Sequence, residues 1–156
     1  MGDFGLGVWA VHLSGAQHDH KVRRLLEIDN CHYIRGSVYD LPSLVQGRFD
    51  IVLFLGVIYH LRHPLLALDK IYDIADGSLF VDSPIIDRWI YDKTLSQSEK
   101  RAILAAGKVF HKLPMLYFTK ANETGDDYNW FMPNIKALED LVISSGFSVN
   151  HILDER

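Results

Sequence analysis

Short apolar runs and longer amphipathic segments alternate along the chain. Runs rich in β-branched and aromatic residues predict strands at Val8–Leu13, His32–Ile34, Ile51–Leu55, Ser78–Asp82 and Phe147–Leu153. Helical spacing predicts helices at Gln17–Ile28, Pro64–Tyr72 and Gln97–Gly107, and a last helix that starts at Pro133 or Asn134 and ends at Ser145–Gly146. Strands that alternate with helices in this way are typical of an α/β fold built on a parallel sheet.

The run Ile51–Leu55 gives the strongest strand prediction, because no polar residue interrupts it between Asp50 and Gly56. An unbroken apolar run of this length is typical of a central parallel strand that is buried on both faces. We therefore expect Gly56 to mark the point where the chain leaves the sheet.

The helix predicted at Pro64–Tyr72 has a proline in its first turn, where the missing N–H costs no hydrogen bond. Its apolar positions Leu65, Leu68 and Tyr72 follow the spacing i, i+3, i+7. We expect Asp76–Gly77 to end this helix before the strand at residues 78–82.

The later part of the chain has a less regular pattern. Segment 83–129 predicts the helix Gln97–Gly107 and then an aromatic-rich loop. A regular pattern returns at Trp130–Asn134, and the last helix follows from apolar residues with helical spacing. These residues are Ile135, Leu138, Leu141 and Val142.

The composition is that of one globular domain spanning residues 1–156, with 48% hydrophobic and 23% charged residues. A formal net charge of -4 argues against a dedicated nucleic-acid binder and leaves RNA recognition to a local patch. The single cysteine, Cys31, excludes an internal disulfide and favours a cytoplasmic location. No apolar stretch approaches the roughly 18 residues of a spanning helix, so we expect no membrane partner.

The sequence contains fragments of three other kinds of site, a phosphate-binding loop, a metal site and a catalytic triad, but each lacks the neighbouring residues or elements that such a site needs. Gly2, Gly5 and Gly7 come before the first predicted strand, whereas a phosphate-binding glycine loop follows a strand and opens a helix. His18 and His20 would point apart on a helix, and His60 and His63 have no acidic partner at helical spacing, so we expect no metal site at these histidines. No serine lies in a G-x-S-x-G elbow, so a serine-histidine-aspartate triad is not expected.

The segment 48–68 combines a strand, the run Gly56-Val57-Ile58-Tyr59-His60, a basic residue at Arg62 and a proline at Pro64. This segment resembles class I S-adenosylmethionine-dependent methyltransferases, and within them the group that includes the tRNA wobble-uridine carboxymethyltransferase. Ser37–Pro42 resembles the adenine-side loop of the same family, and Asn129–Phe147 resembles its helix after the insertion. The resemblance implies a Rossmann-like methyltransferase sheet with helices on both faces.

The resemblance also implies a site for S-adenosylmethionine. The positions of Val38, Tyr39 and Asp40 border the adenine in such enzymes, although a simple turn at a strand end accounts for the same residues. The positions of Leu55 and Tyr59 line the donor and acceptor pocket, with the tyrosine near the transferred group. The alternative for Tyr59 is a loop residue packed against the end of the sheet.

Two further groups have open alternatives. Arg62 either meets a carboxylate or a phosphate as a bidentate donor or faces solvent before a helix. Trp130 and Phe131 either stack on a planar acceptor or cofactor or belong to the core. The resemblance makes Tyr59 and Arg62 the candidate catalytic residues.

The chain departs from the family pattern at both ends. The family's first strand and its glycine-rich cofactor loop are expected before residue 1, and a final antiparallel strand and a basic residue used by the carboxymethyl enzyme are expected beyond Arg156. The next strand usually ends in an acidic residue that binds the ribose hydroxyls, whereas Val8–Val11 runs into His12. A sheet without its first strand leaves backbone groups unpaired. We expect either direct pairing of Val8–Leu13 with Ile51–Leu55 or a homodimer that completes the sheet.

Three functional hypotheses follow. The first is transfer of a methyl or carboxymethyl group from a sulfonium to RNA or a small molecule, a reaction that depends mainly on alignment of the reactants. The second is a non-catalytic member that keeps the fold and serves as a binding or dimerisation module. The third is an unrelated α/β binding module, which the length of the match at residues 48–68 disfavours. The first two hypotheses differ in enzymatic activity, which the family's glycine-rich cofactor loop, expected before residue 1, would support.

Overall fold

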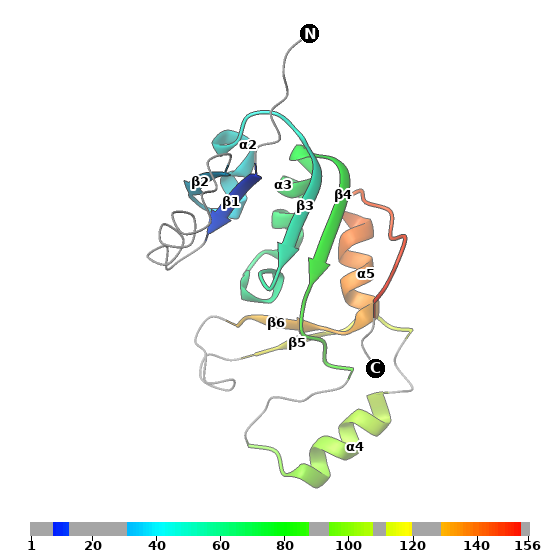
Figure 1. The fold of residues 1–156 in the computed structure, drawn as a ribbon. Helices are drawn as coiled ribbons and strands as arrows, with labels where there is room; N and C mark the ends of the chain where they lie inside the picture. Colours follow the sequence, from blue (N-terminus) through cyan, green and yellow to red (C-terminus); the bar gives the residue numbers. More distant parts are fainter. Residues whose placement is uncertain (1–7, 13–30, 88–93, 108–111, 120–128, 154–156) are drawn as a thin grey trace. The chain divides into compact units, whose positions relative to one another are not determined.

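The computed structural model describes residues 8–12, 31–87, 94–107, 112–119 and 129–153 (Figure 1). The chain forms two compact units, one up to Gly47 and one from Arg48 onward. The helix predicted at Gln17–Ile28 lies outside the described residues. The early glycines and the first two histidines of interest also lie outside them, namely Gly2, Gly5, Gly7, His18 and His20.

The first unit contains a pair of parallel strands, β1 (Val8–His12) and β2 (Cys31–Arg35). Both strands confirm the predictions from the apolar runs. The chain then forms a short 3-10 helix, η1 (Val38–Asp40), and a single turn of α-helix, α2 (Leu41–Leu44). The loop that resembles the family's adenine side is therefore a compact helical turn.

The second unit is built on the parallel strands β3 (Phe49–Leu55) and β4 (Ala75–Asp82). Between them lie the 3-10 helix η2 (Ile58–His60) and the helix α3 (Pro64–Ile74). Parallel neighbours need a crossover connection of this kind, because a tight turn can only join antiparallel strands. The predicted order of strand, helix and strand is confirmed.

The rest of the second unit consists of α4 (Gln97–Gly107), the antiparallel pair β5 (Leu116–Phe118) and β6 (Phe131–Pro133), and α5 (Ile135–Ser144). The helix predictions are confirmed. The aromatic-rich loop was predicted without a strand, and that prediction is wrong at β5. A three-residue strand has too few positions to show a period, and its pairing with β6 alone defines it.

The core of the second unit lies on one face of the β3–β4 sheet, where α3 packs. Ala67, Leu68 and Ile71 are at most 1% exposed, and Phe54 of β3 is 6% exposed. The prediction that β3 is buried on both faces is wrong. The apolar side chains on the other face of this strand are more than half exposed, because α3 packs only against the face that holds Phe54. These exposed residues are Ile51, Leu53 and Leu55.

The buried stripe of α3 also differs from the prediction. Of the three predicted contact residues only Leu68 is buried, whereas Leu65 is 40% and Tyr72 is 44% exposed. The helix buries Ala67 and Ile71 instead, which are one turn apart on the same face. Eight of the eleven residues of this helix are apolar or aromatic, so several stripes had similar spacing and only packing selected one of them.

The junction between α3 and β4 has no turn, so the prediction that Asp76–Gly77 ends the helix is wrong. The helix ends at Ile74, and β4 starts at the next residue. Arg48 holds this junction, because its Nη2 donates to the Ala75 carbonyl and its Nε lies 3.3 Å from an Asp76 carboxylate oxygen. Gly77 is needed there, since a Cβ at this position would collide with the Asp50 carbonyl oxygen.

The C-terminal strand predicted at Phe147–Leu153 does not form, although all of its residues are described. A strand is stable only when its backbone groups pair with a neighbour. The described part of the second unit offers this segment no hydrogen-bonded neighbour. Phe147 packs instead on Tyr72 of α3, with ring centroids 5.0 Å apart in an edge-to-face arrangement.

The described strands pair only within their own units. Among the described strands, β1 pairs with β2, β3 pairs with β4, and β5 pairs with β6. The direct pairing expected between the strand at 8–13 and the strand at 51–55 would join the two units, and it stays a prediction. None of the described helices is long and apolar enough to cross a membrane.

Candidate functional site

The candidate site begins at the C-terminal end of β3, the edge at which α/β proteins bind their ligands. Gly56 follows the strand with φ 68°, a left-handed conformation that glycine adopts without a steric penalty. Its N–H donates to the Asp82 carbonyl at 3.3 Å, so the chain leaves β3 while it is still tied to the end of β4. The turn then directs η2 across the end of the sheet.

Tyr59 lies in η2, directly above this turn. Its hydroxyl oxygen would be 3.8 Å from a Cβ built on Gly56, so the phenol reaches back over the end of β3. The side chain is half-buried, and its ring lies 4.1 Å from the His60 ring at 44°. The Tyr59 carbonyl accepts a hydrogen bond of 2.9 Å from the Trp130 N–H, which ties η2 to the entrance of β6.

Arg62 lies one turn after Tyr59 and reaches the same tryptophan. Its guanidinium carbon is 4.2 Å from the centroid of the Trp130 ring, a cation–π contact worth about 0.5–1 kcal/mol at an exposed position. The arginine is exposed, and no carboxylate within the described ranges forms an ion pair with it. The guanidinium is therefore held in place by the indole while its charge stays uncompensated there.

The β5–β6 pair adds two more aromatic rings beside Trp130. Phe118 and Phe131 lie directly opposite each other in the pairing, with centroids 5.5 Å apart. The Phe118 and Trp130 rings are 6.5 Å apart and tilted by 55°. Phe118 is 53% exposed, whereas the neighbouring Thr119 is buried and donates its hydroxyl to a backbone carbonyl.

Asn134 positions this aromatic pair, and sequence reasoning found only part of its role. The last helix was predicted to start at Pro133 or Asn134, and Asn134 is its N-cap, because its Oδ1 accepts from the Ala137 N–H at 2.8 Å. The same oxygen accepts from the Met115 N–H at 2.9 Å, and its Nδ2 donates to the Leu113 carbonyl at 2.8 Å. A residue that is 4% exposed thus joins the start of α5 to the entrance of β5. The only sequence signal was the capping position.

A second fixed contact supports the start of α5 from the segment after β4. The Asp87 carboxylate accepts a hydrogen bond of 2.8 Å from the Ile135 N–H. The Ile86 N–H donates to the Pro133 carbonyl at 3.0 Å. Carboxylates are favourable at a helix N-terminus, where unpaired N–H groups concentrate partial positive charge. The end of β4, the strand β6 and the start of α5 are therefore tied together.

The predicted adenine-side residues form η1 of the first unit. Ser37 caps this turn by accepting from the Tyr39 N–H at 3.2 Å. Val38 is buried with 5% exposure, so its side chain belongs to the core and a ligand could meet only its backbone. Tyr39 is half-buried, Asp40 is exposed, and the Asp40 carbonyl accepts from the Ser43 hydroxyl at 2.8 Å.

The structure brings some of the predicted residues together. Tyr59 contacts the backbone N–H of Trp130, and Arg62 contacts the Trp130 ring. Leu55 ends β3 with 53% of its side chain exposed, directly before the turn that carries Tyr59. Phe118 was not predicted as a site residue, because nothing in its local sequence placed it beside Trp130.

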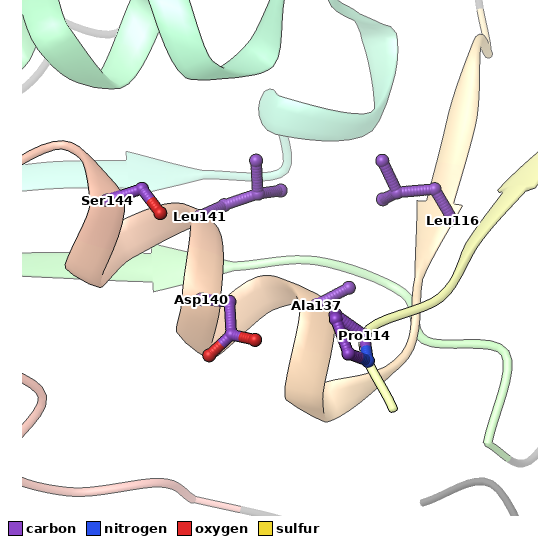
Figure 2. Close-up of a pocket in the computed structure, with 6 residues that line it drawn as sticks. All are labelled: Pro114, Leu116, Ala137, Asp140, Leu141 and Ser144. Atoms are coloured by element: carbon purple, nitrogen blue, oxygen red, sulfur yellow. The ribbon is translucent and has the colours of Figure 1, made fainter. Parts of the chain in front are cut away.

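A separate shallow cavity of about 180 Å³ lies between the entrance of β5 and α5. Figure 2 shows that Leu116 and Leu141 face this space, while the Asp140 carboxylate lies at its rim. Its remaining lining residues are small or cyclic, namely Pro114, Ala137 and Ser144. No predicted site residue lines this cavity.

The resolved pKa shifts lie outside the candidate site. The carboxylates of Asp140 and Glu139 raise the pKa of Lys136 on α5, with Asp140 the larger influence. Hydrogen bonds from the hydroxyl and the N–H of Ser96 lower the pKa of Glu99 at the start of α4. Within the described residues, no three or more His, Cys, Asp or Glu side chains gather as ligands for a metal ion.

Comparison with known proteins relates this chain to methyltransferases. No protein-family model matches the chain. A tRNA U34 carboxymethyltransferase from Campylobacter jejuni is 28% identical over 119 residues, which cover 75% of this chain and 33% of that protein. A tRNA U34 carboxymethyltransferase from Aliivibrio salmonicida is 28% identical over 153 residues, which cover 96% of this chain and 39% of that protein. The chain thus spans between a third and two fifths of these relatives' length.

Solved structures agree on the fold. The N-terminal domain of EvdMO1 with SAH bound superposes with a TM-score of 0.58 at 15% identity, and the match covers 93% of this chain and 57% of that one. Magnesium protoporphyrin IX methyltransferase from Synechocystis with bound SAH also gives 0.58, at 14% identity, with 94% and 57% covered. The predicted resemblance is confirmed: the chain has the α/β fold of class I S-adenosylmethionine-dependent methyltransferases, and its curated relatives are tRNA U34 carboxymethyltransferases.

Proposed function

We propose that this chain is part of an S-adenosylmethionine-dependent enzyme that transfers a methyl or carboxymethyl group to tRNA or to a small molecule. The observation that carries the proposal is the position of Tyr59, whose hydroxyl reaches back over Gly56 at the C-terminal end of β3. The relatives named above act on tRNA U34, which favours RNA as the acceptor. A cytoplasmic location, expected from the single cysteine, is part of the same proposal.

Each unit, taken by itself, contains residues whose chemistry suits a part of the cofactor. In the first unit, the exposed Asp40 carboxylate is an acceptor for an exocyclic amine, and the partly exposed Tyr39 ring offers an apolar face. Val38 contributes its backbone, because its side chain is buried. In the second unit, Leu55 offers an exposed apolar side chain at the strand end.

Bound S-adenosylmethionine would supply a methyl group on a sulfonium, and transfer of a carboxymethyl group would require a donor whose sulfonium carries that group. In either case the bond between the transferred carbon and the sulfur would break, and the thioether would retain the electron pair. The acceptor atom forms the new bond to that carbon and loses its proton to solvent or a nearby base. The protein's contribution to such a step is alignment of the reactants and exclusion of water. We assign this alignment to Tyr59, with Arg62 holding an anionic group of the acceptor or the transferred carboxylate.

Isothermal titration of S-adenosylmethionine and S-adenosylhomocysteine into the purified chain tests the proposal. Micromolar binding that weakens in Asp40→Ala is expected, and Asp69→Ala is the matched control on the exposed side of α3. For transfer, Tyr59→Phe is compared with Tyr72→Phe, which removes a hydroxyl outside the site. Absence of binding up to millimolar ligand, or equal effects of each variant and its control, would reject the enzyme proposal for this chain.

A second candidate function is a homodimeric binding module, and the exposed face of the β3–β4 sheet favours it. Ile51, Leu53 and Phe80 are 63%, 65% and 53% exposed on this face, and apolar patches of this kind mark interfaces. Light scattering of the chain and of Leu53→Glu tests this alternative. A dimer that the variant converts to a monomer supports it, whereas a monomeric parent chain contradicts it.

A further inference from the structure

The side chains of Arg62, Trp130 and Phe118 form a mixed cationic and aromatic surface beside Tyr59. Arg62 and Phe118 are neighbours of the same indole, at 4.2 Å and 6.5 Å from its ring centroid. The two residues come from segments more than fifty positions apart. The hydrogen bond from Trp130 to the Tyr59 carbonyl ties the indole to the segment of Arg62, and β5–β6 pairing ties it to Phe118. The surface is therefore a product of tertiary structure.

Burial does not account for this surface. Phe118 is 53% exposed, and Arg62 is exposed as well. An exposed phenylalanine beside a partly exposed tryptophan offers flat apolar faces on which a planar group can stack. The positions of the rings are set by β5–β6 pairing and by the polar contacts of Asn134, so they exist before any ligand binds.

The charge at this surface selects the kind of planar ligand. Arg62 lies on the indole, and no carboxylate among the described residues neutralises it. A guanidinium held in this way keeps its N–H donors available for a phosphate or another anion. A planar apolar group linked to a phosphate is the chemistry of a nucleotide, and single-stranded nucleic acids bind proteins by this combination of stacking and phosphate contact.

We propose that Phe118, Trp130 and Arg62 form a docking platform for an unpaired RNA nucleotide, with the base stacked on Phe118 and a phosphate bound by Arg62. The platform rests on the proposed function, because its location beside Tyr59 would present the base to the transferred group. Phe118 and Arg62 act as positioning residues in this arrangement. The overall charge of -4 is compatible with it, since recognition uses one local cation and stacking.

The test measures binding of fluorescently labelled oligouridylate to the full chain by anisotropy, without S-adenosylmethionine. Phe118→Leu keeps an apolar side chain of similar bulk but removes the ring, and we expect it to weaken binding about 5- to 150-fold. Leu116→Ala is the matched control, because Leu116 lies two residues away on the same strand and is 46% exposed. We expect this control to bind like the parent chain.

Arg62→Gln tests the phosphate contact through the salt dependence of binding. Loss of one phosphate contact to a single strand lowers the slope of log K against log salt by about 0.7. Arg101→Gln, which removes one exposed arginine from α4, is the matched control and is expected to leave that slope unchanged. An unchanged slope in Arg62→Gln would overturn the assignment of Arg62.

Two further outcomes separate this platform from the proposed function. Oligouridylate binding by a chain that binds no S-adenosylhomocysteine would reject the enzyme and retain the platform. S-adenosylhomocysteine binding without any oligouridylate binding would retain the enzyme and overturn the platform. Equal binding of oligouridylate and of a fully paired RNA stem would also overturn it, because paired bases cannot stack on Phe118.

Discussion

Two regions of the second unit are stabilised internally by different interactions: the α3 side of the β3–β4 sheet and the β5–β6 pair. Apolar side chains almost without exposure fill the space between α3 and the sheet, with Leu68 at 0%. The β5–β6 pair exposes Leu116 and Phe118, and polar contacts of the buried Asn134 hold its entrance. The first region is stabilised by burial and tolerates few cavities, whereas the second is stabilised by backbone pairing and by hydrogen bonds of side chains such as Asn134. The scaffold and the candidate RNA surface can therefore be disrupted separately.

The largest expected effect comes from the apolar region. Leu68→Ala removes most of a fully buried side chain, so we expect it to lower the free energy of unfolding by about 2–5 kcal/mol. Urea denaturation followed by circular dichroism measures the change. Leu65→Ala on the same helix, where the parent side chain is 40% exposed, is the control and should cost clearly less. Similar costs in both variants would contradict the packing of α3.

The next effect tests the polar region. Asn134→Ala removes the cap of α5 and both contacts to the segment before β5, and we expect a loss of about 2 kcal/mol in unfolding free energy. Asn134→Asp keeps the accepting oxygen but loses the donor to Leu113, so an intermediate loss is expected. Trp130 fluorescence should change in the alanine variant. An alanine variant with parental stability would show that the pair is held by other contacts.

A smaller effect is expected where the two regions meet. Gly56→Ala forces a residue with a Cβ into φ 68°, which costs roughly 1–2 kcal/mol. Gly107→Ala is the control, because no atom lies within 4 Å of its added methyl group. Thermal unfolding of both variants measures the difference. A neutral Gly56→Ala variant would mean that the turn carrying Tyr59 adopts another conformation.

The smallest effect concerns α4, which buries no residue and depends on its first turn. Ser96 and Glu99 form a reciprocal capping arrangement, and this lowers the pKa of the Glu99 carboxyl in the folded chain. A lowered pKa gives stability that is present above the unfolded pKa and lost as the pH falls through the folded pKa. NMR titration of the α4 resonances should show this loss in acid, and Glu99→Gln should abolish the pH dependence. A Glu99→Gln variant with the parental profile would contradict it.

The helices and parallel strands were predictable because their patterns are long or uninterrupted. The run at residues 51–55 and the capped helix from Asn134 were found at nearly their observed bounds. The buried stripe of α3 was not predictable, because many neighbouring apolar residues gave equivalent spacings. The burial of β3 on both faces was also predicted wrongly, since an apolar run does not reveal whether a helix covers one face or two.

The candidate site divides in the same way. Tyr59, Arg62 and Trp130 were recognisable from local motifs that resemble a methyltransferase. Their mutual contacts were not, because Trp130 at the entrance of β6 and Tyr59 in η2 are about seventy positions apart in the sequence and meet only in the folded chain. Phe118 had no local signal at all. Its importance depends on its exposure and on the neighbouring indole, which are properties of the folded chain.

The sequence by itself determined the α/β class, the position of the strand-end glycine and the residues that resemble methyltransferase motifs. These features depend on local periodicity and on residue chemistry, which the linear order carries. The tertiary structure decided which face of β3 is covered, that residues 147–153 form no strand, and that Arg62 and Phe118 meet at Trp130. Such properties require partners distant in sequence, because burial, strand pairing and ring contacts exist only between segments that packing has brought together.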